Sequence, residues 1–233
     1  MNNNSSPPDR YGLVGHPVEH SRSPFIHTLF ARQTGQRLTY ELIDASPAAF
    51  ETAVRGFGAA GGKGLNVTVP HKEAAFVLVD QASDAARIAG AVNTISIDGG
   101  RLRGDNTDGV GFIRDVTTNQ GQALAGRSIV LFGAGGAARG IVGPLLAEHP
   151  AALVIANRTK PRALDLAAHF GNPPEIEVVA FDELAELPAF DVLVNATSAG
   201  LKGEATPFPG SLVRADSFCY DMVYSRGDTP FVA

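Results

Sequence analysis

The sequence contains one cysteine, Cys219, among its 233 residues. A single cysteine cannot form an internal disulfide, and such sparse use of cysteine is typical of proteins from reducing compartments. The chain also lacks any apolar run that approaches the ~20 residues needed for a membrane-spanning helix. We therefore expect a soluble, cytoplasmic protein.

The chain has no excess of positive charge and no signal-peptide pattern. Its formal net charge is -5 at pH 7, whereas proteins that bind nucleic acids or anionic membranes usually have a basic surface. Residues 1–9 (MNNNSSPPD) have neither the basic start nor the apolar stretch of a signal peptide, so we expect a loose tail. We expect a small-molecule substrate and no nucleic-acid or membrane partner, and we leave a homodimer open as the assembly.

Short apolar runs alternate with segments of helical periodicity along the chain, which is the pattern of an α/β fold. In the first half, strands are predicted at 11–15, 38–43 and 64–69, with a strand pair at 92–97 and 101–103 joined by the turn at 98–100. Helices are predicted from Ser23 as the N-cap, with an apolar face of Phe25, Ile26, Leu29 and Phe30, and at 47–57, 71–79 and 83–89.

The second half has a more regular βαβ pattern. Strands are predicted at 128–132, 152–156, 175–181 and 191–195, and helices at 137–146 and 161–170. This alternation predicts a mostly parallel sheet with helices on both faces. We expect two domains: an N-terminal α/β substrate-binding, catalytic domain at 10–108 and a Rossmann-type dinucleotide-binding domain at 109–233.

A glycine-rich motif, Gly133-x-Gly135-x-x-Ala138, lies between a predicted strand and a predicted helix. Gly133 permits a tight turn, Gly135 lets the backbone approach a pyrophosphate, and Ala138 allows close helix–strand packing. The helix N-terminus would present N–H groups to the phosphates. Glycine turns of this kind are common, but the flanking strand and helix and the following βα unit favour nucleotide binding.

The end of the next predicted strand distinguishes between the two nicotinamide cofactors. NAD-binding proteins usually carry a carboxylate there, which binds the ribose hydroxyls. Here the strand ends in Asn157-Arg158-Thr159-Lys160, with Arg162 close behind. Three cations could pair with a 2′-phosphate, and Arg158 could also stack on adenine. A solvated basic loop is the alternative interpretation, but this position favours NADP over NAD.

Polar side chains follow one of the strands predicted in the first half. Asn66 and Thr68 are two residues apart, so both should point to one face, whereas Val67 and Val69 should point into a core. Lys72 follows at the start of a predicted helix, where a cation interacts unfavourably with the helix dipole. That position suggests a functional role, with an ordinary surface lysine as the alternative.

Asp108 could simply cap a helix that begins at Val110. Paired with Lys72, it would instead form a proton-transfer unit, because oxidation of a secondary alcohol removes a hydride from carbon and a proton from oxygen. A desolvated lysine can take that proton, and a carboxylate can orient the lysine or the hydroxyl. A neighbouring negative charge favours the protonated ammonium, and the sequence leaves open which effect dominates.

Ser21 and Ser23 bracket a loop that leads into the first predicted helix. Their hydroxyls and the N–H groups of the helix start could hold a carboxylate. The alternative is that Ser23 only caps its helix. We predict no metal site, because the paired spacing of zinc ligands is not found among His16, His20, His27 and His71.

Taken together, these segments resemble the shikimate dehydrogenase family, in the family's order, from about residue 10 to the last residue. The motifs of the first half are Gly15-His16-Pro17, Ser21-Arg22-Ser23-Pro24, Gly61-Gly62-Lys63-Gly64, NVTVPHK at 66–72, Ala89 to Thr94 (AGAVNT) and GDNTDG at 104–109. Those of the second half are GAGGAAR at 133–139, Ala156-Asn157-Arg158-Thr159, Asn195-Ala196-Thr197-Ser198 and Tyr220 to Tyr224 (YDMVY).

The resemblance implies reversible, NADPH-dependent reduction of 3-dehydroshikimate to shikimate in aromatic amino-acid biosynthesis. It gives Lys72 and Asp108 the role of a catalytic pair. It implies substrate binding by Ser21, Ser23, Asn66, Thr68, Asn93 and Tyr224. It implies NADP binding by Gly133, Ala134, Gly135, Gly136 and Ala137 at the pyrophosphate, by Asn157, Arg158, Thr159 and Arg162 at the 2′-phosphate, and by Met222 near the nicotinamide.

One departure from the family pattern concerns the end of the sequence. Family members continue with a glycine-rich stretch, a substrate-contacting glutamine and helices that return to the first domain, whereas this sequence stops at Ala233. We therefore expect weaker substrate binding and lower stability than in a complete member. Two alternatives remain: an NAD-using quinate/shikimate dehydrogenase, and an inactive binder of a dinucleotide or shikimate.

Overall fold

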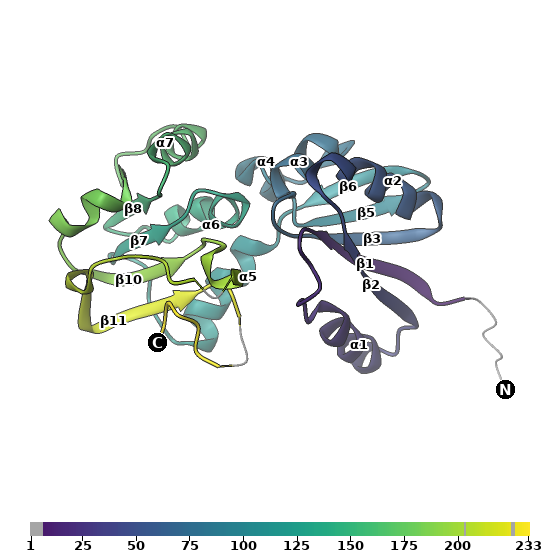
Figure 1. Ribbon diagram of the computed structural model, residues 1–233, viewed down its shortest axis with the longest axis horizontal. Coiled ribbons are helices and arrows are strands. Elements are labelled where there is room, and N and C mark those ends of the chain that lie inside the picture. Colours follow the sequence, from purple (N-terminus) through teal and green to yellow (C-terminus); the bar gives the residue numbers. More distant parts are fainter. Residues whose placement is uncertain (1–6, 203, 225–226) are drawn as a thin grey trace. The chain divides into compact units, whose positions relative to one another are not determined.

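The computed structural model describes residues 7–202, 204–224 and 227–233. The chain divides into two compact units, each built around its own sheet (Figure 1). The first unit comprises the chain up to Arg87 together with Ala91–Asn106, and the second comprises Ile88–Gly90 and Thr107–Ala233. Across the described ranges, no helix is long and apolar enough to cross a membrane. The assignment of 10–108 and 109–233 as functional domains remains a prediction.

The first unit contains a mixed six-stranded sheet. Its strands are β1 (Asp9–Gly15), β2 (Leu38–Asp44), β3 (Gly62–Val67), β4 (Gln81–Ala82), β5 (Thr94–Asp98) and β6 (Arg101–Asp105), in the order β2-β1-β3-β5-β6-β4. β1 is parallel to β2 and β3, β5 is antiparallel to β3 and β6, and β4 is parallel to β6. Gly99 and Gly100 join β5 to β6 with positive φ angles of 54° and 82°, as a tight hairpin turn requires.

Helices lie on both faces of this first sheet. They are α1 (Ser23–Thr34), the 3-10 segment η1 (Pro47–Ala49), α2 (Phe50–Ala59), α3 (Lys72–Leu78) and α4 (Asp84–Ala89). Figure 1 shows α1 on one face and α2 and α3 on the opposite face. The core under α2 and α3 includes Val54, Leu65, Ala75 and Ile95, all buried.

The structure corrects several predictions for the first unit. β3 ends at Val67, so Thr68 and Val69 follow the strand rather than belonging to it, and Val69 is 37% exposed instead of buried in a core. α1 begins at Ser23 itself with Arg22 as its N-cap residue, so Ser23 does not cap the helix. β1 begins at Asp9, which the sequence analysis placed in the loose tail, whose residues 1–6 lie outside the described residues.

The predicted apolar face of α1 is not part of a core. Phe25 is 63% exposed and Phe30 is 54% exposed, and Ala31 is the residue of this helix that is buried. Helical periodicity therefore predicted the helix but not the burial of this face. The short strand β4 was not predicted, because two residues carry no recognisable alternation of apolar and polar side chains.

The second unit contains a five-stranded sheet in which every pair is parallel, as predicted. Its strands are β7 (Ser128–Phe132), β8 (Ala152–Ala156), β9 (Ile176–Val179), β10 (Phe190–Asn195) and β11 (Val213–Asp221), in the order β11-β10-β7-β8-β9. β7 is a continuous apolar run in which residues 129–132 are fully buried, because a central parallel strand is covered on both faces.

The two faces of this sheet are covered differently. The helices are α5 (Asp108–Arg114), the π-helical η2 (Asp115–Asn119), α6 (Gly136–Ala147) and α7 (Lys160–His169), with 3-10 segments η3 (Phe181–Glu186), η4 (Ala199–Lys202) and η5 (Gly210–Leu212). The core of one face joins α5, α6 and α7 to the sheet. The core of the opposite face includes Leu184 of η3, Leu212 of η5 and Phe231, so short 3-10 segments replace the α-helices predicted there.

Two further differences concern elements that bear on the site. β11 was not predicted, because Asp216 and Ser217 interrupt its apolar residues. Its pairing with β10 also shifts register between Phe190 and Val192. α5 begins at Asp108 with Thr107 as its N-cap residue, so Asp108 does not cap a helix that begins at Val110.

Asp191 connects three strands at their amino ends. Its carboxylate accepts hydrogen bonds from the N–H and hydroxyl of Ser128 on β7, at 2.8 and 2.7 Å, and pairs with Arg214 on β11. The two Ser128 hydrogen bonds, followed by Arg214, lower the pKa of Asp191 from 3.8 to about 2. The folded protein therefore keeps this carboxylate charged at a lower pH than the unfolded chain does.

We expect Asp191→Asn to remove a stabilising contribution that depends on pH. That contribution is fully present above pH 3.8 and is lost as the pH falls through about 2. The variant should melt at a lower temperature than the parent at neutral pH, and the difference should shrink below pH 4. Thermal unfolding at a series of pH values measures this, and a difference that stays constant from pH 7 to pH 2 would contradict the assignment.

Candidate functional site

The predicted substrate-binding residues of the first unit lie at one edge of its sheet. β1 and β3 are parallel and end there, and β5 begins there because it is antiparallel to β3, with Thr94 opposite Asn66. The loops and strand ends at this edge carry Ser21, Ser23, Asn66, Thr68, Lys72 and Asn93. Topology therefore gathers residues that are far apart in the sequence.

Hydrogen bonds order this edge. The Asn66 amide accepts from Tyr40 Oη at 2.7 Å and donates to Thr94 Oγ1 at 3.3 Å, and Thr94 Oγ1 donates to Asn93 Oδ1 at 2.9 Å. His27 stacks on Tyr40 with ring centroids 4.2 Å apart, and burial lowers its pKa. Asn66 and Asn93 are thus parts of one polar chain of side chains.

Main-chain hydrogen bonds fix the loops that hold Thr68 and the serines. The Thr68 N–H donates to Val14 O at 2.9 Å, so the segment after β3 is held against the end of β1. Ser21 Oγ donates to Ser23 Oγ at 3.0 Å and accepts from the Ser23 N–H at 3.2 Å. The two hydroxyls therefore lie together at the start of α1.

Lys72 is the first residue of α3, and its main chain is tied to the same edge. The Val92 N–H donates to Lys72 O at 2.8 Å. The preceding residue, His71, is buried; its Nε2 lies 2.7 Å from Ala45 O, and its ring stacks on Phe50 at 4.5 Å. Burial lowers the pKa of His71, which favours the neutral ring as the donor to that carbonyl. Lys72 thus extends from a rigidly held helix start.

Asp108 belongs to the second unit, where it opens α5. The next residue, Gly109, packs against α6: a Cβ at this position would lie 2.3 Å from Pro144 Cγ and 2.6 Å from Gly140 O. Further along, Tyr220 on β11 donates its hydroxyl to Asp115 Oδ2 at 2.9 Å, and burial followed by Asp115 raises the pKa of Tyr220 to about 12. These contacts place Asp108 relative to α6. Pairing of Lys72 with Asp108 remains a prediction.

The glycine motif has the conformation that a phosphate-binding turn needs. Gly133 has φ +108° and follows β7 directly, and a Cβ on it would lie 3.1 Å from both the carbonyl carbon and oxygen of Ala196. Gly135 is the N-cap of α6, and no neighbouring atom lies within 4 Å of the position of a Cβ there. Ala138 is fully buried in the core, so the third motif position allows close packing as predicted.

The basic segment after β8 includes one cation that has an ion-pair partner. Lys160 Nζ lies 2.7 Å from both carboxylate oxygens of Glu183, and this contact, followed by the Ala180 N–H, lowers the pKa of Glu183. Lys160 therefore already has a carboxylate partner in this structure. Arg158 is exposed, and Asn157 Nδ2 donates to Thr159 O at 2.8 Å, which shapes the loop around it.

A group of polar residues for which no role was predicted lies beside the Gly133 turn. Asn195 ends β10 and Asp221 ends β11, and their side chains are joined by a hydrogen bond of 3.0 Å. Met222 follows Asp221, and its N–H donates to Asn195 O at 3.0 Å. The two motifs were visible in the sequence, but the contact between them depends on β11, which was not predicted. Tyr224 follows in the same unit and is exposed.

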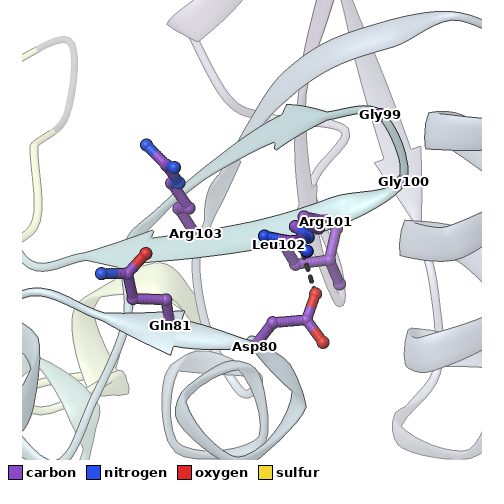
Figure 2. Close-up of a pocket in the computed structure, with 7 residues that line it drawn as sticks. All are labelled: Asp80, Gln81, Gly99, Gly100, Arg101, Leu102 and Arg103. Carbon is purple, nitrogen blue, oxygen red and sulfur yellow. Dashed lines mark hydrogen bonds between the residues drawn. The ribbon is translucent and has the colours of Figure 1, made fainter.

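A surface cavity of about 590 Å³ lies at the opposite edge of the first sheet (Figure 2). It is lined by the β5–β6 turn with Arg101 and Arg103, and by Asp80 and Gln81. The Asp80 carboxylate accepts the Leu102 N–H at 2.8 Å, so one of its oxygens already has a hydrogen-bond partner within the protein. None of the predicted site residues lines this cavity. In the parts of the chain that the structure describes, no group of three or more His, Cys, Asp or Glu residues could hold a metal ion.

Two family descriptions match most of the chain. "Shikimate dehydrogenase substrate binding domain" matches residues 13–95, and "Shikimate / quinate 5-dehydrogenase" matches residues 115–202. The shikimate dehydrogenase (NADP(+)) of Aeromonas hydrophila is 55% identical over 97% of this chain and 82% of its own length. That of Alkalilimnicola ehrlichii is 53% identical over 96% of this chain and 82% of its own length.

A solved structure shows the same fold. Shikimate 5-dehydrogenase from Thermus thermophilus, in complex with NADP(H) and shikimate, matches with a TM-score of 0.82 and 34% identity, over 96% of this chain and 82% of that one. With matches of this extent to both halves of the chain, the protein belongs to the shikimate dehydrogenase family.

Proposed function

We propose that this chain catalyses the reversible reduction of 3-dehydroshikimate to shikimate with NADPH, a step of the shikimate pathway. The observation that carries this proposal is the 53–55% identity to NADP(+)-dependent shikimate dehydrogenases over nearly the whole chain. The polar edge of the first sheet and the glycine turn of the second unit supply the chemistry that such a reaction needs.

The residues of the second unit fit NADP. A side chain at Gly133 would be strained by the φ of +108° and crowded by Ala196, and the open space at Gly135 lets a pyrophosphate approach the N-terminus of α6. We assign the pyrophosphate to Gly133, Ala134, Gly135, Gly136 and Ala137, the 2′-phosphate to Asn157, Arg158, Thr159 and Arg162, and the nicotinamide side to Met222. When bound, NADP supplies the hydride chemistry: the oxidised form accepts a hydride and the reduced form donates one.

The residues of the first unit fit a hydroxylated carboxylate. Ser21 and Ser23 present two adjacent hydroxyls at a helix start, which can donate to the substrate carboxylate. Asn66, Thr68 and Asn93 supply amide and hydroxyl groups for the ring hydroxyls, and we assign Tyr224 to the substrate as well.

Lys72 and Asp108 would manage the proton. In the oxidation of shikimate, Lys72 takes the proton of the reacting hydroxyl while a hydride leaves the carbon that bears this hydroxyl. In the reduction, Lys72 returns a proton to the carbonyl oxygen. Asp108 orients the lysine or the hydroxyl. The fixed start of α3 suits this role, because a general base must be held within hydrogen-bond reach of its proton.

A cytoplasmic location and a homodimer also belong to this proposal. The single cysteine fits a reducing compartment. Sedimentation velocity of the purified chain would test the assembly.

The direct test is NADP-dependent oxidation of shikimate by the 233-residue chain, followed as NADPH absorbance, with NAD and quinate as parallel substrates. We expect turnover with shikimate and NADP. Faster turnover with NAD and quinate would favour the quinate/shikimate alternative. Stabilisation by NADP in a melting assay without any turnover would indicate an inactive binder.

We expect Lys72→Ala to lower kcat by about 10²–10⁴-fold, the usual contribution of a general base, with a much smaller effect on shikimate binding. Lys63→Ala, which removes an exposed lysine of β3, is the matched control and should retain parental kinetics. Steady-state kinetics together with shikimate titration separate the two effects. Weakened binding with unchanged kcat would refute the general-base role.

We expect Arg158→Ala to weaken NADP binding by about 10–100-fold, as loss of a charge-assisted contact does, while NAD binding stays almost unchanged. Arg101→Ala, which removes an exposed arginine of the β5–β6 hairpin, serves as the control for loss of one positive charge. Calorimetric titration with both cofactors measures the effect. Equal losses for NADP and NAD would exclude a specific contact with the 2′-phosphate.

A further inference from the structure

A buried polar cluster lies where β10 and β11 end, side by side in the sheet of the second unit (Figure 1). Asn195, Thr206 and Thr229 are each at most 5% exposed, and Thr197 and Asp221 are partly buried. Burying polar groups is costly unless hydrogen bonds satisfy them. Here the side chains of the cluster form hydrogen bonds with one another, and these hydrogen bonds determine how the side chains are oriented.

The orientation of the Asn195 amide follows from its partners. Asn195 Oδ1 accepts the Thr197 N–H at 3.1 Å and also the hydroxyls of Thr197 and Thr206, at 2.8 and 3.0 Å. A backbone N–H can only donate, so the amide oxygen must face this side. The amide NH₂ group therefore faces Asp221, to which it donates at 3.0 Å.

The Asp221 carboxylate then holds the chain on two sides. Its Oδ1 accepts both Asn195 Nδ2 and the Val223 N–H at 3.0 Å, and its Oδ2 accepts Thr229 Oγ1 at 2.5 Å. The Met222 N–H donates to Asn195 O. Met222 is thus fixed to the end of β10, and Val223 and Thr229 are fixed to Asp221 at the end of β11, which is itself joined to Asn195.

This cluster is adjacent to the glycine turn. β10 lies directly beside β7 in the sheet, and Gly133 after β7 is in close contact with the backbone of Ala196 and Thr197 after β10. From β7 the strand order runs one way through β8 and β9 and the other way through β10 and β11. Ligands of such sheets bind at the carboxyl ends of the strands at this point of reversal.

We propose that Asn195 and Asp221 are positioning residues for hydride transfer. Through this cluster they fix the Met222–Val223 segment relative to the Gly133 turn, and so fix one wall of the space for the nicotinamide relative to the pyrophosphate. They act through the chain that they hold and not by contact with the substrate. The proposal rests on the proposed NADP-dependent reaction.

The test is Asp221→Ala, which removes the three contacts of the carboxylate, assayed with shikimate and NADP. We expect kcat to fall by about 10²-fold, as small displacements of reacting groups commonly cause. NADP affinity should change less than about threefold, because the Gly133 turn and the basic segment keep their own hydrogen bonds. With shikimate deuterated at the reacting carbon, the isotope effect on kcat should rise, since hydride transfer becomes more strongly rate-limiting.

Two further variants separate positioning from stability. Asp221→Asn should recover most of the lost kcat, because its amide oxygen can accept from Asn195 and Val223 while its NH₂ group donates to Thr229. Asp191→Ala breaks the contacts at the opposite, amino ends of the same strands, and should lower the melting temperature while leaving kcat and the isotope effect at parental values.

The outcomes are distinct. The positioning role is wrong if Asp221→Ala keeps the parental kcat. It is also wrong if Asp221→Ala and Asp191→Ala lose kcat and melting temperature to the same extent. If the parent chain has no turnover with shikimate and NADP, the proposed function fails and this inference with it. Should Asp221→Ala fail to fold, the near-isosteric Thr229→Val removes one contact, and a lower kcat with a raised isotope effect is again the expected result.

Discussion

The close approach of the Gly133 turn to the backbone after β10 is the constraint on which the site of the second unit depends. β7 and β10 are neighbours in the sheet, and a Cβ at position 133 would lie only 3.1 Å from Ala196. Glycine therefore lets the two loops converge at the point where the strand order reverses. The same turn leads directly into α6, whose N-cap is Gly135, so the N–H groups and the positive end of the helix dipole lie next to this convergence.

The predicted substrate-binding residues of the first unit lie at one edge of its sheet, and the cavity lies at the opposite edge. β1 and β3 end at one edge and β5 begins there, so the loops and strand ends that carry Ser21, Asn66 and Asn93 lie at the same edge although much of the first unit separates them in the chain. The opposite edge has the glycine turn of the β5–β6 hairpin and the cavity beside Asp80 (Figure 2), and none of the predicted site residues lines that cavity. A mixed sheet is useful for this purpose, because an antiparallel strand brings its beginning next to the end of its neighbour.

Local sequence predicted those elements whose signal is local. β7 and β8 match the predicted bounds, because buried parallel strands are continuous apolar runs. β11 was missed because Asp216 and Ser217 interrupt its pattern. Nonlocal contacts at the candidate site were not predicted: Lys160 is paired with Glu183, and Asn195 with Asp221, partners that no spacing in the sequence reveals. The family resemblance supplied roles for residues that lie in loops, where periodicity gives no signal.

The two ends of β10 show why polar residues are used differently along one strand. At its amino end Asp191 joins β7 and β11 through a partly exposed carboxylate. At its carboxyl end the contacts of Asn195 have a fixed donor and acceptor direction, which apolar side chains would not provide. Apolar packing tolerates small shifts, whereas a satisfied polar cluster permits one arrangement. At this end β10 borders the Gly133 turn, so a cluster that permits one arrangement also fixes the backbone that the turn contacts.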